Sequence, residues 1–290
     1  MSGKTGIFFQ QMSSCENADC IIIGLPWDGT VSNRPGARFG PQAVRSATLG
    51  VEDYSPYLNR DISDVRLFDA GDIELPFGDT EAVLRVIRRE YALLADFKGK
   101  PLALGGEHLV SLPLLEVMHE RYGDDLFVIQ LDAHADLRTD YLGVKYSHAT
   151  VMNLITGLIG IENTAVIGVR SGTRDEWEML RSRPNCFGGA SSLPIDAFSV
   201  FALGKLGKRP VYITFDLDVF DPGILPGTGT PDPGGLTFRE FVKLVRVFDS
   251  LTIVGADIVE LAPDYDSSGI SSALAATVFR ELLLVLGKKE

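Results

Sequence analysis

Acidic and histidine side chains follow three apolar runs of this sequence, at the points where buried strands would end. The runs are "PLALGG" (101–106), "DLFVIQL" (125–131) and "PVYITF" (210–215). The side chains that follow them are, in chain order, Glu107, His108, Asp132, His134, Asp136, Asp216, Asp218 and Asp221. Carboxylate oxygens and imidazole nitrogens are ligands of first-row divalent metal ions, so these residues together would suit a metal centre.

The spacing of these residues favours convergence on one point. Side chains two positions apart on a strand share a face, as Asp132, His134 and Asp136 would. Ligands of open α/β sheets collect beyond the carboxyl ends of the strands. Any one of these segments could instead be an ordinary turn, since Asp often ends a strand. Several carboxylates held together cost free energy unless a cation neutralises them, so we favour the metal centre.

The size of the set predicts two metal ions rather than one. Six ligands exceed what a single ion with open positions needs, which favours two ions that share bridging carboxylates. The candidate ligands are His108, Asp132, His134, Asp136, Asp216 and Asp218. The set is rich in carboxylates and contains no thiolate, which points to Mn²⁺ more than to a structural zinc. Cys15, Cys20 and Cys186 show no CxxC spacing and predict neither a thiolate site nor a disulfide framework.

Short apolar runs that alternate with helical patterns would position these residues. Seven runs are rich in branched side chains and bounded by Gly, Pro or Asp, which is typical of strands buried on both faces. They are 20–25, 65–71, 101–106, 125–132, 164–169, 210–216 and 251–259. Helices are predicted over 79–97, over 237–248 with Thr237 and Glu240 in capping-box spacing, and from 271 to Gly287. The alternation predicts a mainly parallel sheet with helices on both faces.

Composition limits the fold class and the partners. The 290 residues, 45% of them hydrophobic and 23% charged, show no repeat or low-complexity linker, so we expect a single domain over 1–290. The net charge of −12 disfavours nucleic acid and mildly favours small cations. Apolar stretches stop short of the roughly 18 residues of a membrane span. The segment "MSGKTGIFFQQ" lacks the apolar core of a secretory signal, so we expect a cytoplasmic protein.

Six segments in family order resemble the ureohydrolase family of arginases and agmatinases, and agmatinases most of all. They are "RPGARFGPQAVR" (34–45), "GGEH" (105–108), "DAHAD" (132–136), "SHATVM" (147–152), "FDLDVFDPGILPGTGTPDPGGL" (215–236) and "DIVELAPDYD" (257–266). The resemblance implies a three-layer α/β/α fold with a mostly parallel, eight-stranded sheet. It also implies a dinuclear manganese centre and a homo-oligomer, either a trimer or a hexamer.

The resemblance assigns the ligands of two Mn²⁺ ions. It places one ion among His108, Asp132, Asp136 and Asp216, and the other among His134, Asp132, Asp216 and Asp218. Asp132 and Asp216 would bridge the two ions. Two neighbouring positions depart from the commonest family pattern, because Glu107 stands where Asp is frequent and Leu109 where Ser is frequent. Neither position is a ligand, so the departures concern the outer shell of the first metal and not the metal count.

The resemblance also implies catalytic and substrate-binding roles in the hydrolysis of a guanidinium to urea and a primary amine. Asp136 would orient the attacking water, and Glu260 would accept hydrogen bonds from the guanidinium. His148 would relay a proton, although a lone loop histidine is more often only a satisfied polar residue. Arg138 stands where arginases carry an Asn that meets the amino-acid end of arginine. Together with the wider similarity to agmatinases, this makes agmatine, cleaved to putrescine and urea, the expected substrate. His119 receives no role.

Other functions within and outside this reaction class remain open at this point. The substrate could be that of a guanidinobutyrase, an aminopropylagmatine ureohydrolase, an arginase or a formiminoglutamase. A non-enzymatic alternative is a metal-holding scaffold. The scaffold is disfavoured because all six ligands occur together with His148 and Glu260.

Overall fold

The computed structural model describes residues 12–183, 185–188 and 194–288, and its centre is an eight-stranded sheet in which every neighbouring pair is parallel. The strand order is β4-β1-β5-β10-β9-β6-β7-β8. The strands are β1 (Cys20–Leu25), β4 (Leu67–Asp72), β5 (Lys100–Gly105), β6 (Phe127–Leu131), β7 (Thr164–Ile167), β8 (Cys186–Phe187), β9 (Pro210–Asp216) and β10 (Thr252–Val259). A separate antiparallel pair joins β2 (Tyr54–Ser55) and β3 (Arg60–Asp61).

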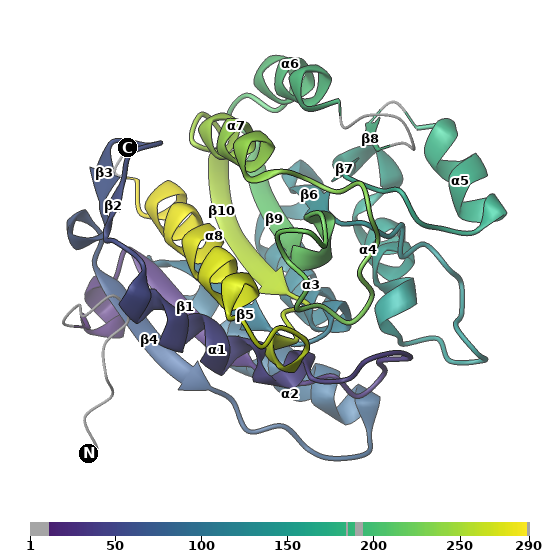
Figure 1. Ribbon diagram of the computed structural model, residues 1–290, viewed down its shortest axis with the longest axis horizontal. Helices are drawn as coiled ribbons and strands as arrows, with labels where there is room; N and C mark the ends of the chain where they lie inside the picture. Colours follow the sequence, from purple (N-terminus) through teal and green to yellow (C-terminus); the bar gives the residue numbers. More distant parts are fainter. Residues whose placement is uncertain (1–11, 184, 189–193, 289–290) are drawn as a thin grey trace.

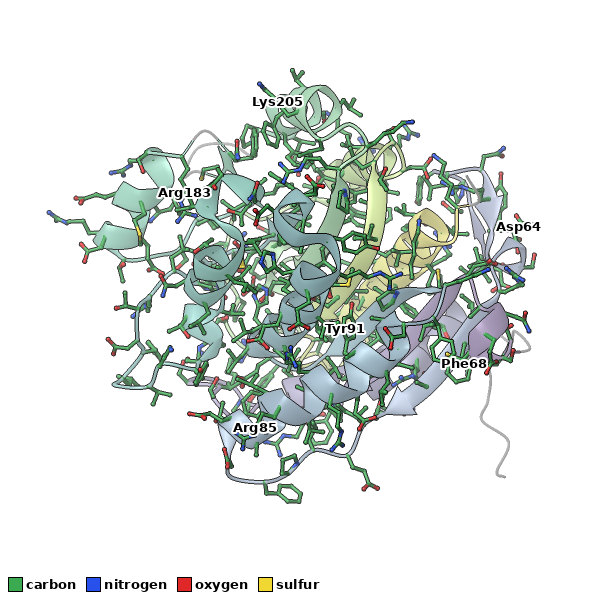
Figure 2. All side chains as sticks on the ribbon, turned by 180° about the vertical axis from the view of Figure 1, so that it is seen from behind. Asp64, Phe68, Arg85, Tyr91, Arg183 and Lys205 are labelled. Atoms are coloured by element: carbon green, nitrogen blue, oxygen red, sulfur yellow. The ribbon has the colours of Figure 1, made fainter. Side chains whose placement is uncertain are left out.

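Helices cover both faces of the sheet, which gives the three layers that the sequence predicts (Figure 1). One face carries α1 (Gly40–Ala47), α6 (Ile195–Lys205), α7 (Phe238–Phe248) and α8 (Ile270–Leu286). The other carries α2 (Thr80–Ala95), α3 (Ser111–Tyr122), α4 (Val151–Ile159) and α5 (Arg174–Arg181). Figure 2 shows this second face, where Tyr91 of α2 is buried and Arg85 of the same helix is exposed.

Alternate residues of each strand enter two separate hydrophobic cores. On β5, Leu102 and Leu104 join the core under α8, whereas Ala103 joins the core under α3. Burial on both faces explains why the strands read as continuous apolar runs instead of alternating ones. All seven predicted strands are confirmed, and the eighth is β8, whose two residues are too short to produce a sequence pattern.

The predicted helix ends are confirmed by their caps. Thr237 and Glu240 form a reciprocal capping box at the start of α7, and Gly287 caps the end of α8. Pro41 lies in the first turn of α1, where its missing N–H costs nothing. The N-terminal segment "MSGKTGIFFQQ" lies outside the described residues, and the single domain over 1–290 stays a prediction. Across the described part of the chain, the helices are too short or too polar to span a membrane.

β6 ends before the acidic and histidine residues that follow it in the sequence. The strand predicted over 125–132 ends at Leu131, so strand alternation is not what brings Asp132, His134 and Asp136 together. The chain instead bends, and Asp136 takes a left-handed φ of 54°. Glu260 after β10 has a φ of 66°. Non-glycine residues rarely adopt this conformation, and such strain concentrates at functional sites. The loops after β5, β6, β9 and β10 meet at one edge of the sheet.

Candidate metal centre

His108 lies at the centre of the first group of acidic side chains. Its Nδ1 atom is 3.1 Å from Oδ2 of Asp132, 3.2 Å from Oδ2 of Asp136 and 3.3 Å from Oδ2 of Asp216. The buried Nδ1 nevertheless has no hydrogen-bond partner with good geometry among the described residues. On the opposite side of the ring, Nε2 lies 2.9 Å from Oγ1 of Thr214. This contact holds the ring with Nδ1 facing the carboxylates, as a metal-binding histidine requires.

A second group surrounds His134 and shares Asp132 with the first. The Nδ1 atom of His134 is 2.8 Å from Oδ2 of Asp218 and 3.7 Å from Oδ1 of Asp132. Two sets have ligand atoms close enough together to hold a metal ion, namely His108, Asp132 and Asp136, and Asp132, His134 and Asp218. Asp132 occurs in both sets, which agrees with a bridging role. Asp216 belongs to neither set and contacts the first only through His108, so its bridging role stays a prediction.

Backbone N–H groups hold the carboxylates in place. Asp132 accepts from the N–H of His134 at 2.6 Å, and Asp216 accepts from the N–H of Asp218 at 2.8 Å. Asp218 itself accepts from the N–H of Ala133 at 3.0 Å, which ties the loop after β9 to the loop after β6. Asp216 and Asp218 are therefore each fixed through Oδ1 while Oδ2 faces a histidine, and Oδ2 of Asp132 also accepts from Nε2 of Gln130 at 2.8 Å.

The electrostatics of the cluster favour added positive charge. Burial opposes protonation of His134, but the carboxylates of Asp218 and Asp132 outweigh it and raise the pKa of His134 to about 12. Burial and the charge of Asp132 raise the pKa of Asp136 to about 7. Burial and the same kind of repulsion raise the pKa of Asp216 well above its usual range. The raised pKa values show that added positive charge stabilises the cluster. Divalent cations would supply the same positive charge, so the residues fit a metal pair.

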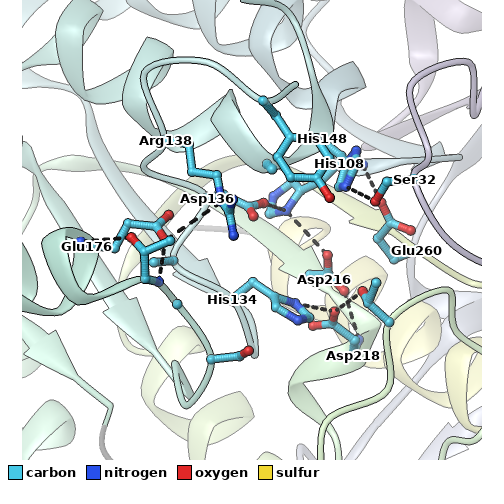
Figure 3. Close-up of a pocket in the computed structure, with 17 residues that line it drawn as sticks. Ser32, His108, His134, Asp136, Arg138, His148, Glu176, Asp216, Asp218 and Glu260 are labelled. Atoms are coloured by element: carbon cyan, nitrogen blue, oxygen red, sulfur yellow. Dashed lines mark hydrogen bonds and ion pairs between the residues drawn. The ribbon is translucent and has the colours of Figure 1, made fainter. Parts of the chain in front are cut away.

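A cavity of about 320 Å³ opens onto this cluster and is lined by the other predicted site residues (Figure 3). His148, Glu260 and Arg138 all line it together with the predicted ligands other than Asp132. Glu260 is buried and accepts from the backbone N–H of His108 at 2.8 Å. Burial lowers the pKa of His148, so its ring is neutral at pH 7 and able to accept a proton.

Four further residues at the cavity were missed by sequence reasoning. Ser32 lies 3.3 Å from Nε2 of His148, and the Tyr141 ring packs edge-on against His148 with centroids 5.6 Å apart. Glu176 and Thr230 also line the cavity. These residues lie in loops and on a helix with no repeated spacing relative to the metal motifs. Thr230 lies within the segment "GTGTPDPGG".

Asp221 and His119 are not part of the candidate metal centre. Asp221 accepts hydrogen bonds from the N–H groups of Gly223 and Gly234, which is the ordinary work of a turn aspartate. His119 is half-buried on α3. Neither residue lines the cavity within the described part of the chain.

The fold and the site together define an α/β/α protein in which two neighbouring groups of His and Asp side chains could each hold a metal ion. Comparison with known proteins gives the same class. The family described as the Arginase family matches residues 18–285. Agmatinase of Bacillus subtilis (strain 168) is 44% identical over 291 residues, which cover 98% of this chain and 96% of that relative.

Solved structures agree with the sequence match. A structure from Clostridium difficile is 40% identical with a TM-score of 0.89, over 94% of this chain and 99% of that one. Proclavaminate amidino hydrolase from Streptomyces clavuligerus is 33% identical with a TM-score of 0.84, over 94% of this chain and 92% of that one. The chain belongs to the arginase family, and the predicted resemblance and fold are confirmed.

The sharing of Asp132 predicts how metal content responds to substitution. The protein loaded with Mn²⁺ should hold about two ions per chain. Asp132→Ala should lose both ions, because Asp132 belongs to both ligand sets, whereas His134→Ala should retain one. His119→Ala, a histidine change outside the cavity, should retain both. Elemental analysis after gel filtration measures this, and an Asp132→Ala protein that keeps both ions would contradict the shared ligand.

Proposed function

We propose that this chain is an agmatinase-type ureohydrolase, which converts agmatine and water to urea and putrescine. The observation that carries the proposal is that Glu260 and His148 line the same cavity as the candidate metal ligands. Membership of the arginase family and 44% identity to a relative named agmatinase support the reaction class. The cavity volume suits a small molecule, and its buried carboxylates suit a cationic one.

We propose two Mn²⁺ ions per chain, held by His108, Asp132, Asp136 and Asp216 and by His134, Asp132, Asp216 and Asp218. When bound, such a pair supplies Lewis-acid chemistry and lowers the pKa of water. The absence of thiolates from the ligand set favours Mn²⁺ over zinc. Asp216 contacts the centre through Nδ1 of His108 and through the backbone N–H of Asp218.

The remaining steps belong to side chains of this protein. Glu260 accepts hydrogen bonds from the substrate guanidinium and opposes its charge. Asp136 accepts a hydrogen bond from the attacking water and so orients it toward the planar guanidinium carbon. As the water oxygen bonds to the guanidinium carbon, the water gives up a proton, which His148, neutral at pH 7, takes and passes to the leaving amine. The carbon–nitrogen bond to the alkyl chain breaks, and urea and the primary amine are released.

The far end of the cavity favours a substrate with a terminal ammonium. The Arg138 guanidinium lies over the Tyr141 ring at 5.0 Å, with its Nε 3.9 Å from Oε2 of Glu176. A substrate carboxylate that paired with Arg138 would have to compete with Glu176. A terminal ammonium would instead meet the Glu176 carboxylate favourably. This arrangement supports agmatine over arginine and guanidinobutyrate.

We also propose a cytoplasmic homo-oligomer, a trimer or a hexamer. Cys15, Cys20 and Cys186 are free thiols in the described structure, as suits a reducing compartment. Sedimentation of the purified protein measures the subunit number.

Removal of the His148 ring should separate catalysis from metal binding. His148→Ala should lower turnover of agmatine by about 100-fold or more, the range expected when a general acid–base group is lost. The Mn²⁺ content should stay unchanged, because His148 is not among the proposed ligands. His119→Ala serves as the matched control and should keep normal turnover. Urea release under saturating agmatine measures this, and normal turnover of His148→Ala would exclude the proton relay.

Substrate preference should follow the charge at the far end of the cavity. With equal Mn²⁺ loading, kcat/KM for agmatine should exceed that for arginine at least about tenfold, a difference of about 1.4 kcal/mol. The panel also contains guanidinobutyrate, aminopropylagmatine, formiminoglutamate and proclavaminate precursors with a guanidine. If guanidinobutyrate is preferred and the preference disappears in Arg138→Ala, Arg138 binds a carboxylate and the agmatinase assignment is wrong. Preference for aminopropylagmatine would indicate a cavity built for a longer polyamine.

A further inference from the structure

The loop after β1 is fastened to the segment after β5 that carries His108. The N–H of Glu107 donates to the carbonyl of Trp27 at 2.8 Å. A Cβ atom at Gly106 would lie 1.9 Å from that carbonyl oxygen, so only glycine allows this approach. The two backbones are therefore in direct contact, and residues 27–32 are placed relative to the metal centre by the end of β5.

Glu107 adds a second attachment within this contact. Its side chain is fully buried, and both carboxylate oxygens are used by one residue. The N–H of Thr30 donates to Oε2 at 2.8 Å, and the hydroxyl of Thr30 donates to Oε1. A buried carboxylate is costly unless it is hydrogen-bonded, and Thr30 supplies both bonds. Glu107 thus fixes the position and the hydroxyl direction of Thr30.

Thr30 in turn holds the backbone of His148. Because the Thr30 hydroxyl proton points to Glu107, its oxygen presents lone pairs on the other side. The N–H of His148 donates to that oxygen at 3.1 Å. Two residues further along the same loop, Ser32 lies 3.3 Å from Nε2 of the His148 ring. The loop after β1 therefore contacts His148 at both its backbone and its ring.

We propose that Glu107 and Thr30 are positioning residues for His148, and this inference rests on the proton-relay role given to His148 above. The segment after β5 would then position three groups of the site at once. His108 faces the carboxylates, its N–H holds Glu260, and Glu107 holds His148 through Thr30. Glu107 is one of the two departures from the common family pattern. An aspartate there would be shorter by one carbon–carbon bond, about 1.5 Å, and would not reach Thr30 from the same backbone.

Thr30→Val tests this inference because it removes the hydroxyl while retaining the branched shape and the N–H. Turnover of agmatine should fall about tenfold, the effect of one lost hydrogen bond of about 1.4 kcal/mol. KM should change less than about twofold and Mn²⁺ content should stay constant, because Thr30 contacts neither the substrate end nor the ligands. Thr30→Ser keeps the hydroxyl and is the matched control, with turnover close to that of the unmodified protein.

A double-mutant cycle shows whether Thr30 acts through His148. In the His148→Ala background, Thr30→Val should lower turnover no further, since the group that it positions is gone. If His148→Ala is impaired and Thr30→Val lowers turnover equally in the unmodified protein and in His148→Ala, the inference is overturned. The proposed function would still stand in that case. Normal turnover of His148→Ala would overturn both together. Glu107→Asp gives a second route if Thr30→Val does not fold, with the same loss expected in the unmodified background and none in His148→Ala.

Discussion

Mutual repulsion among buried carboxylates is the constraint on which the rest of this structure depends. Asp132, Asp136, Asp216 and Asp218 lie together at the edge of the sheet, almost completely removed from water. Such a group is stable only when positive charge lies among the oxygens. The raised pKa values of His134, Asp136 and Asp216 show how strongly the site favours positive charge. The proposed pair of divalent ions would supply that charge and, once bound, the chemistry for hydrolysis.

A parallel sheet supplies the rigid edge that can hold such a group. Its strands are buried on both faces, so their ends are fixed by the two cores and not by the loops alone. The chain bends sharply at the site, as the left-handed backbones of Asp136 and Glu260 show. The short segment after β5 then connects the ligand His108 with Glu260 and, through Thr30, with His148. This one segment therefore positions groups proposed for metal binding and for proton transfer.

Much of this could be predicted from the sequence, because strand runs, capping boxes and metal-ligand types are local patterns. The capping box of α7 and the sequence positions of the seven longer strands needed no tertiary information. The bend at Asp136 could not be predicted, since a strand pattern gives no signal for a left-handed residue. The contacts of Thr30 with Glu107 and His148 were also missed, because they join loops separated by 77 and 118 positions. The role of Glu107 as an anchor became visible only in space.

Anomalous diffraction from crystals grown with Mn²⁺ would test the metal pair most directly. The account predicts two peaks per chain, about 3.5–4 Å apart, as in other two-metal hydrolases. One peak should lie beside His108 and Asp136 and the other beside His134 and Asp218, with Asp132 in contact with both. A single peak, or two peaks that do not share Asp132, would contradict the claim that buried carboxylate repulsion is resolved by a bridged pair of ions.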